Sequence, residues 1–203
     1  MKQIWIYIGL LVTFGSCAKQ KVSEEELKKY IRDVDNGLRQ SIKAGEFAVE
    51  ATYQPTDLFV LRELGSSKAD TASLNKWHKK YGGHYYFILS ISKNGKEAIT
   101  PTQMPYDEFS DLLQTVSFRL GEYINMTTAK QDTIPLADFI YNRTFGMATG
   151  SDILMVFDKK KAAQTDWVQI NLKELGLGLG TQNFRFDRER LDEAPEIDFN
   201  RAN

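Results

Sequence analysis

Three glycines at alternate positions are the residues of this sequence that most resemble a chemical motif. The stretch "LGLGLG" places Gly176, Gly178 and Gly180 at a spacing that suggests a phosphate-binding loop. A dinucleotide fingerprint needs a further glycine at 181, where Thr181 stands, followed by a helix with an acidic partner beyond it. We therefore predict a bulged or bent strand here, in which glycine permits a close approach of the backbone.

The two histidines, His78 and His84, are the next candidates for catalysis or metal binding. Neither has a companion at metal-ligand spacing, and the sequence contains no G-x-S-x-G or H-E-x-x-H pattern. A catalytic serine, histidine and aspartate could still assemble from distant positions, because triads are defined by geometry rather than order. The sequence itself assigns no catalytic residue, no cofactor-binding residue and no metal ligand.

A group of aromatic residues is the strongest candidate for binding. The stretch "WHKKYGGHYY" contains Trp77, Tyr81, His84 and Tyr86, which could stack on a sugar ring or on a partner's side chains. Core packing is the competing interpretation, since aromatic residues at helical and strand spacing normally face inward. We expect any patch for a ligand or a partner to lie here.

Acidic residues near the C-terminus suggest a calcium loop or an acid–base pair. They lack the D-x-[DN]-x-[DN]-G spacing of a calcium loop, and arginines alternate with them. We predict a solvated, salt-bridged strand end instead. The acidic residues are Asp187, Glu189, Asp192 and Glu193, and the arginines are Arg185, Arg188 and Arg190.

The composition limits the class of protein. The chain has 203 residues, of which 42% are hydrophobic and 26% charged, as is ordinary for a globular protein. A net charge of −1 provides no basic field for nucleic acid, so no nucleic-acid partner is expected. The single cysteine, Cys17, cannot form an internal disulfide.

The segment before Cys17 is typical of a signal peptide. A basic Lys2 precedes an apolar run from Ile4 to Phe14, which is too short to span a bilayer comfortably as a helix. Two small residues, Gly15 and Ser16, then lead into the cysteine.

The stretch "TFGSC" resembles the lipobox of bacterial lipoproteins, although Phe14 stands where leucine is more usual. In those proteins the signal is cut before the cysteine, which is then acylated. The resemblance implies that residues 1–16 are removed, that Cys17 is lipidated and that residues 17–22 form a tether. Because Ala18 rather than aspartate follows the cysteine, it also implies the outer membrane, on either face. A secreted protein with a free thiol and an uncleaved signal anchor are the competing interpretations.

Hydrophobic periodicity predicts helices and strands along the remaining chain. Ser23 and Glu26 form a capping box at the start of a helix. The continuous apolar run "DILMVF" predicts a central strand buried on both faces. Further helices are expected in 56–65, 71–82 and 105–115, and further strands in 47–54, 85–92, 116–120, 137–145, 166–172 and 182–187.

These elements predict one globular domain over residues 23–192. We expect an α+β fold that is mainly antiparallel and sandwich-like, with several helices in its N-terminal half. The charged residues 193–203 are expected to form a loose tail.

Residues 35–64 resemble a segment of uncharacterised Bacteroidetes lipoproteins, in which an Asn-Gly-Leu turn precedes a strand that ends in Tyr-x-Pro-x-Asp-Leu. Two Asp-Thr triplets, at Thr71 and Thr133, also resemble the O-glycosylation motif of periplasmic proteins of that group. The resemblance implies an envelope lipoprotein of that lineage and transfers no catalytic residue. The matching residues of the segment are Asn36, Gly37, Leu38, Tyr53, Pro55, Asp57 and Leu58.

The sequence thus favours a lipoprotein that acts by binding. We expect an accessory or interaction subunit of an envelope assembly, held to the membrane by acyl chains and contacting other envelope proteins. A binder of glycans or small ligands that uses the aromatic patch is the alternative, and an envelope hydrolase is the least favoured. No cofactor is expected.

Overall fold

The computed structural model describes residues 19–65 and 69–200. The predicted signal segment and the lipidation site predicted at Cys17 therefore lie outside the described residues. The predicted α+β class with mostly antiparallel sheets is confirmed. None of the helices in the described part of the chain is long and apolar enough to cross a membrane.

The larger sheet, called here the large sheet, is antiparallel throughout. The alternation predicted for residues 47–54 appears in it as a strand whose Val49, Ala51 and Tyr53 are buried. The strand order is β2-β3-β4-β9-β8, with β5 paired to β4. These strands are β2 (Arg39–Ala44), β3 (Phe47–Gln54), β4 (His84–Lys93), β5 (Lys96–Glu97), β8 (Asp138–Asn142) and β9 (Ser151–Asp158).

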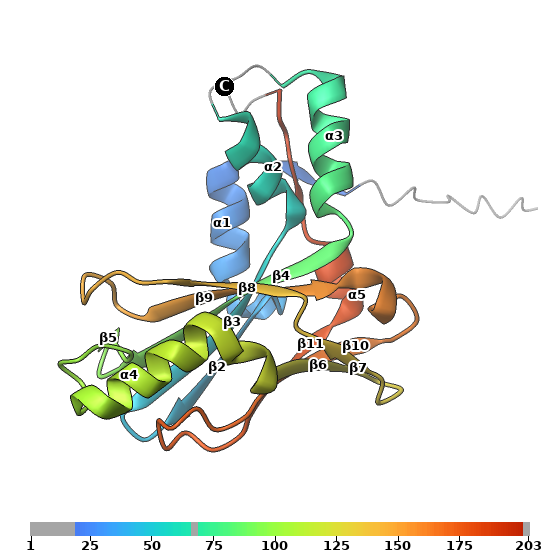
Figure 1. The fold of residues 1–203 in the computed structure, drawn as a ribbon. Helices are drawn as coiled ribbons and strands as arrows, with labels where there is room; N and C mark the ends of the chain where they lie inside the picture. Colours follow the sequence, from blue (N-terminus) through green and yellow to red (C-terminus); the bar gives the residue numbers. More distant parts are fainter. Residues whose placement is uncertain (1–18, 66–68, 201–203) are drawn as a thin grey trace, which may run out of the picture.

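A smaller antiparallel sheet packs face to face with the large sheet, as Figure 1 shows. The rings of Phe87 and Phe186, one from each sheet, lie 4.9 Å apart between their centroids. The core therefore lies between the two sheets, in the sandwich-like arrangement that the sequence predicts. The small sheet has the order β11-β10-β6-β7, made of β6 (Ile124–Thr128), β7 (Thr133–Pro135), β10 (Trp167–Leu172) and β11 (Gln182–Asp187).

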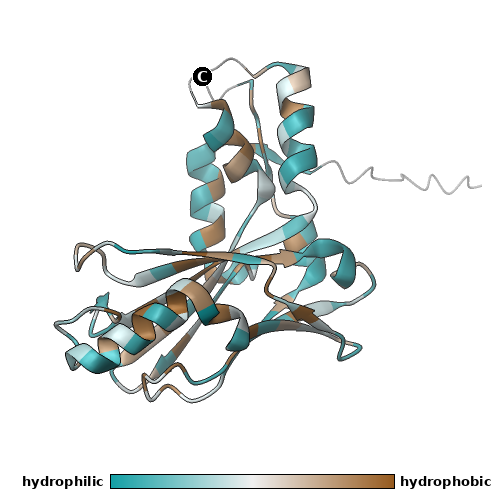
Figure 2. Ribbon diagram, viewed as in Figure 1, coloured by the Kyte–Doolittle hydropathy of each residue, from teal (hydrophilic) through white to brown (hydrophobic). Residues whose placement is uncertain are grey.

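Three helices stand on the outer face of the large sheet, away from the small sheet (Figure 1). They are α1 (Glu24–Arg32), α2 (Thr56–Leu64) and α3 (Thr71–Tyr81). On the other side of the sheet, α4 (Tyr106–Gln114) alternates hydrophobic and hydrophilic stripes along its length (Figure 2). It buries Phe109 and Leu112 in the core. The short helix α5 (Arg188–Asp192) follows β11.

The capping box predicted for α1 is present. The Glu26 backbone N–H donates to Ser23 Oγ at 3.2 Å, and the Ser23 backbone N–H donates to Glu26 Oε2 at 2.8 Å. The helix buries Leu27 and Ile31 and contacts β3, so it is fixed at the rim of the outer face.

Residues 116–120 are helical, and the strand predicted for them is wrong. From α4 the chain continues into a π-helical turn, Thr115–Arg119, and a 3-10 helix, Leu120–Glu122. Val116 and Leu120 are fully buried, whereas Phe118 is 81% exposed. Apolar residues at i, i+2 and i+4 suggest a strand, but the two buried ones are also four apart, as on one face of a helix.

The two ends of the described chain pair with each other. Strand β1 (Lys21–Val22) runs parallel to β12 (Glu196–Ile197), and Val22 and Ile197 are both buried. The loose tail predicted from residue 193 is therefore wrong as far as residue 200, and the tether predicted over residues 17–22 ends inside the fold. The charged composition of this segment gave no sign of its attachment to the fold. Ile197 donates its backbone N–H to the buried Asp57 carboxylate at 2.7 Å.

Candidate functional site

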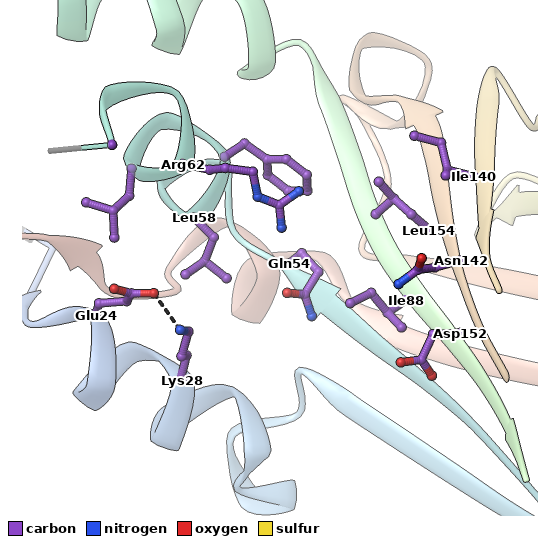
Figure 3. Close-up of a pocket in the computed structure, with 13 residues that line it drawn as sticks. Glu24, Lys28, Gln54, Leu58, Arg62, Ile88, Ile140, Asn142, Asp152 and Leu154 are labelled. Carbon is purple, nitrogen blue, oxygen red and sulfur yellow. Dashed lines mark ion pairs between the residues drawn. The ribbon is translucent and has the colours of Figure 1, made fainter. Parts of the chain in front are cut away.

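A cavity of about 790 Å³ opens between the outer face of the large sheet and the helices α1 and α2 (Figure 3). We call it the groove. The strands supply its floor, and the helices supply its walls. The floor residues include Gln54, Ile88, Ile140, Asn142, Asp152 and Leu154, and the walls include Leu58, Phe59 and Arg62 from α2 and Glu24 and Lys28 from α1.

The floor of the groove contains an apolar row across three strands. Ile88 pairs with Leu154, which pairs in turn with Ile140. Their side chains share one face because antiparallel partners in register point to the same side of a sheet. Ile140 is 58% exposed and the other two are half-buried. An apolar patch that stays open to solvent in a concave surface is typical of a binding site.

Polar groups border the apolar row on both sides. Asp152 and Asn142 form the next row of the sheet. On the other side, the Arg62 guanidinium lies over the Phe59 ring, 5.8 Å from its centroid. Among the described residues, neither Arg62 nor Asp152 has an ion-pair partner, whereas Glu24 and Lys28 pair with each other at 2.5 Å. The groove therefore offers one free cation and one free anion across an apolar floor.

The large sheet also explains why the run "DILMVF" is apolar throughout. Its strand, β9, is a central strand as predicted, and it lies between β4 and β8. Ile153, Met155 and Phe157 are buried in the core, but Leu154 and Val156 on the other face are only half-buried. Burial on both faces is thus incomplete, because α1 and α2 cover only part of the outer face (Figure 1).

The aromatic residues singled out in the sequence do come together. Ring centroids lie 6.5 Å apart for Trp77 and Tyr81, 6.1 Å for Tyr81 and Tyr86, and 6.2 Å for His84 and Tyr86. Phe59 joins them, 4.2 Å from Tyr86, and connects the cluster to the wall of the groove. Tyr86 is only 6% exposed, so the cluster chiefly packs α2 and α3 against β4.

Charged groups cover the outer side of this aromatic cluster. Lys76 and Lys80 lie over the Trp77 ring, with Nζ 4.3 and 5.0 Å from its centroid. Tyr81 donates its hydroxyl hydrogen to Glu63, and this bond and Lys80 hold the pKa of Glu63 below its usual range. Burial raises the pKa of Tyr86 to about 12. The cluster is therefore not an open stacking platform.

The glycines of "LGLGLG" lie in a loop, and the strand predicted for them is wrong. Gly176, Gly178 and Gly180 have φ values of +92°, +71° and +64°, a region that favours glycine. Backbone N–H groups of Gly176, Leu177 and Gly178 donate to Glu174 Oε1 at 2.7, 2.6 and 2.9 Å, and Gly180 donates to Oε2. The loop does cradle an anion, but that anion is the chain's own carboxylate.

The acidic series near the C-terminus is salt-bridged at Asp192, but the strand end predicted for it is correct only at Asp187, because Glu189 and Asp192 lie in α5. Asp192 pairs with Lys159 at 2.7 Å and with Arg188 at 2.6 Å, while Asp187 caps α5. No three His, Cys, Asp or Glu side chains within residues 19–65 and 69–200 gather as a metal site requires.

Sequence reasoning missed the residues that make the groove. Ile88, Leu154 and Ile140 occupy outward positions in the predicted strands, and their alternation with core residues was the available signal. Alternation identifies the face of a strand but not the neighbouring strand, so it could not bring the three together.

Comparison with known proteins shows no family for this chain. No protein-family model matches it, and no curated protein matches it. A DUF4426 family protein from Pseudomonas aeruginosa PAO1 is 12% identical with a TM-score of 0.38, over 74% of this chain and 92% of that one. A protein of unknown function from Burkholderia pseudomallei K96243 has the same identity and TM-score, over 86% and 94% of the two chains. Similarity at this level identifies no function for this chain.

Proposed function

We propose that this chain is a membrane-tethered lipoprotein of the bacterial envelope that binds a partner protein in the groove. The lipobox-like stretch before Cys17 supports the tether. The observation that carries the binding role is the apolar row of Ile88, Leu154 and Ile140, which is open to solvent beside α2.

The occupant that best fits the groove is an extended segment of the partner protein. Such a segment offers apolar side chains to the floor, an acidic residue to Arg62 and a basic residue to Asp152. Strand β8 also lies at the edge of the large sheet, where an added strand can pair with its backbone. A glycan fits less well, since Tyr86 is buried and lysines cover Trp77.

Ile140→Glu tests this proposal in the full lipidated protein. A charge placed on the apolar floor should weaken partner binding by at least about tenfold, which corresponds to about 1.4 kcal/mol. The fold should survive because Ile140 is largely exposed. The measurement is affinity capture from detergent-solubilised membranes, with the captured protein quantified by mass spectrometry.

Phe118→Glu is the matched control, since Phe118 is also an exposed apolar residue but lies outside the groove. A partner lost by the Ile140 variant and kept by the control supports the groove. Equal capture by both variants, or no partner with the native protein, would count against it.

A further inference from the structure

A second cavity, of about 320 Å³, lies where β3, α2 and α3 meet the C-terminal residues. It shares no lining residue with the groove. Six of its lining residues carry the inference, and all have polar or charged side chains. They are Lys19, Tyr53, Asp57, His78, Lys159 and Asp192.

Three polar groups of this cavity retain hydrogen-bonding capacity. Tyr53 is 5% exposed, and its hydroxyl forms no hydrogen bond with any described residue. His78 Nε2 is buried and lies 3.2 Å from Asp57 Oδ1, but their geometry does not make a hydrogen bond. Asp57, only 8% exposed, uses Oδ2 to accept from the backbone of Ile197 and keeps Oδ1 free of hydrogen bonds within the described chain. Of these three atoms, His78 Nε2 is buried without a hydrogen-bond partner, and a buried polar atom normally has one. The cavity therefore calls for a ligand that satisfies it.

The Asp57 carboxylate is the group of this cavity that favours a cation. Lys159 is paired with Asp192 at 2.7 Å, and Lys19 is paired with Glu196 at 3.5 Å. Asp192 also pairs with Arg188 at 2.6 Å, so these cations are all engaged by carboxylates other than Asp57. Asp57 has no lysine or arginine partner among the described residues, and the His78 ring is the titratable group beside it. Burial raises the pKa of Asp57, although the hydrogen bond from Ile197 and the charges of His78 and Lys19 act to lower it.

We propose that this cavity binds a primary amine. A primary ammonium group carries N–H donors for all three free groups, namely the Asp57 carboxylate, the Tyr53 hydroxyl and the His78 ring nitrogen in its acceptor form. Its charge also gives the Asp57 carboxylate a cationic partner. A quaternary ammonium has no N–H to donate, so the site discriminates between ethanolamine and choline.

The amine has two possible sources, a free small molecule and the ethanolamine headgroup of a lipid. Lys19 stands at the rim two residues after Cys17, and two extended residues span at most about 7 Å. If Cys17 is acylated as proposed, the rim lies within reach of lipid headgroups. The headgroup source therefore rests on the proposed tether, whereas the amine site itself does not.

Calorimetric titration of the purified full chain in detergent tests the amine site. Ethanolamine should bind in the millimolar range, and choline at least about tenfold more weakly. Asp57→Asn retains an oxygen for Ile197 and should lose at least about tenfold in ethanolamine affinity. His78→Gln should also weaken binding, while His84→Gln, which changes the histidine outside the cavity, should leave it unchanged.

The thermal unfolding of each variant shows whether its fold is intact. Tyr53→Phe, which keeps the ring and removes only the hydroxyl, serves as the second cavity variant if Asp57→Asn fails to fold. Equal binding of ethanolamine and choline, or no binding of ethanolamine in the millimolar range, overturns the proposal.

Vesicles separate the two sources. Calorimetric titration of the Cys17→Ala protein with phosphatidylethanolamine vesicles, but not phosphatidylcholine vesicles, should give heat if the headgroup is the ligand. If dissolved ethanolamine gives binding heat and neither kind of vesicle does, the ligand is a free amine rather than a lipid headgroup. The titrations with ethanolamine and with vesicles do not depend on partner capture by the Ile140→Glu variant. A failure of the amine site can therefore be distinguished from a failure of the groove.

Discussion

Three carboxylates, Asp57, Glu97 and Glu174, hold backbone segments in place. Asp57 accepts from the backbone of Ile197, and Glu174 accepts from four backbone N–H groups of its own loop. The buried Glu97 accepts from the Thr144 hydroxyl and from the Gly146 backbone. Each satisfies donors that have no strand or helix partner, and charged acceptors make such bonds stronger.

Replacing Glu174 should destabilise the protein in a pH-dependent manner. Burial alone would raise the pKa of Glu174, but the four backbone hydrogen bonds bring it below its ordinary value. A lowered folded-state pKa stabilises the protein above the unfolded pKa, and this contribution is lost as the pH falls through the lowered value. Glu174→Gln should therefore cost about 1 kcal/mol at neutral pH, because solvent screens the carboxylate, and less in acid.

Urea unfolding at neutral and acidic pH measures this difference. Glu122→Gln is the control, since it removes a charge from an exposed glutamate outside the loop. A stability loss for Glu174→Gln that is equal at both pH values would contradict the role of the ionised Glu174 carboxylate as acceptor of the four backbone hydrogen bonds.

At the scale of elements, hydrophobic periodicity predicted those strands that bury one face. The alternation in β10 and β11 corresponds to Val168 and Ile170 in the one and Phe184 and Phe186 in the other, all in the core. Periodicity failed at residues 116–120, where a strand and a helix predict the same two buried positions. It also failed at the glycine loop, where Glu174 provides the hydrogen bonds that a strand neighbour would have provided.

The helical turn after α4 makes a prediction that a strand does not. Leu120→Ala should lower the free energy of unfolding by about 2–5 kcal/mol, because Leu120 is fully buried in the core. Phe118→Ala should change it by no more than about 0.5 kcal/mol, since Phe118 is exposed. Chemical denaturation of the two variants gives both values. Similar losses of unfolding free energy for the two variants would contradict the helical turn and support a strand.

At the scale of the whole molecule, the sequence predicted the class and the sandwich but not the site. The buried faces of the strands were readable because each strand carries its own alternation. The groove depends instead on which strands are neighbours, and Ile88 and Ile140 come from distant parts of the chain. The second cavity depends on a C-terminal segment whose charged composition suggested a tail.

The proposed tether predicts whether the protein is found in the membrane fraction or in the soluble fraction. Cys17→Ala removes the residue that is proposed to carry the acyl chains, and stable anchoring needs more than one chain. The variant should therefore leave washed membranes and appear in the soluble fraction, as measured by fractionation and immunoblotting. Ile140→Glu, which changes only the groove, should stay with the membrane. Membrane retention of the Cys17 variant through washing would refute acylation as the anchor.

The pairing of β1 with β12 has a mechanical consequence. When a tethered protein also holds a partner, tension enters the domain through the N-terminal end of β1. A force along β1 acts parallel to both strands and therefore loads the hydrogen bonds between β1 and β12 in shear. These hydrogen bonds then oppose the force at the same time. From β12 the load passes through Ile197 to Asp57 on α2, whose Leu58 and Arg62 line the groove. If the proposed anchor and the proposed partner are both engaged, the C-terminal segment bears the force between them.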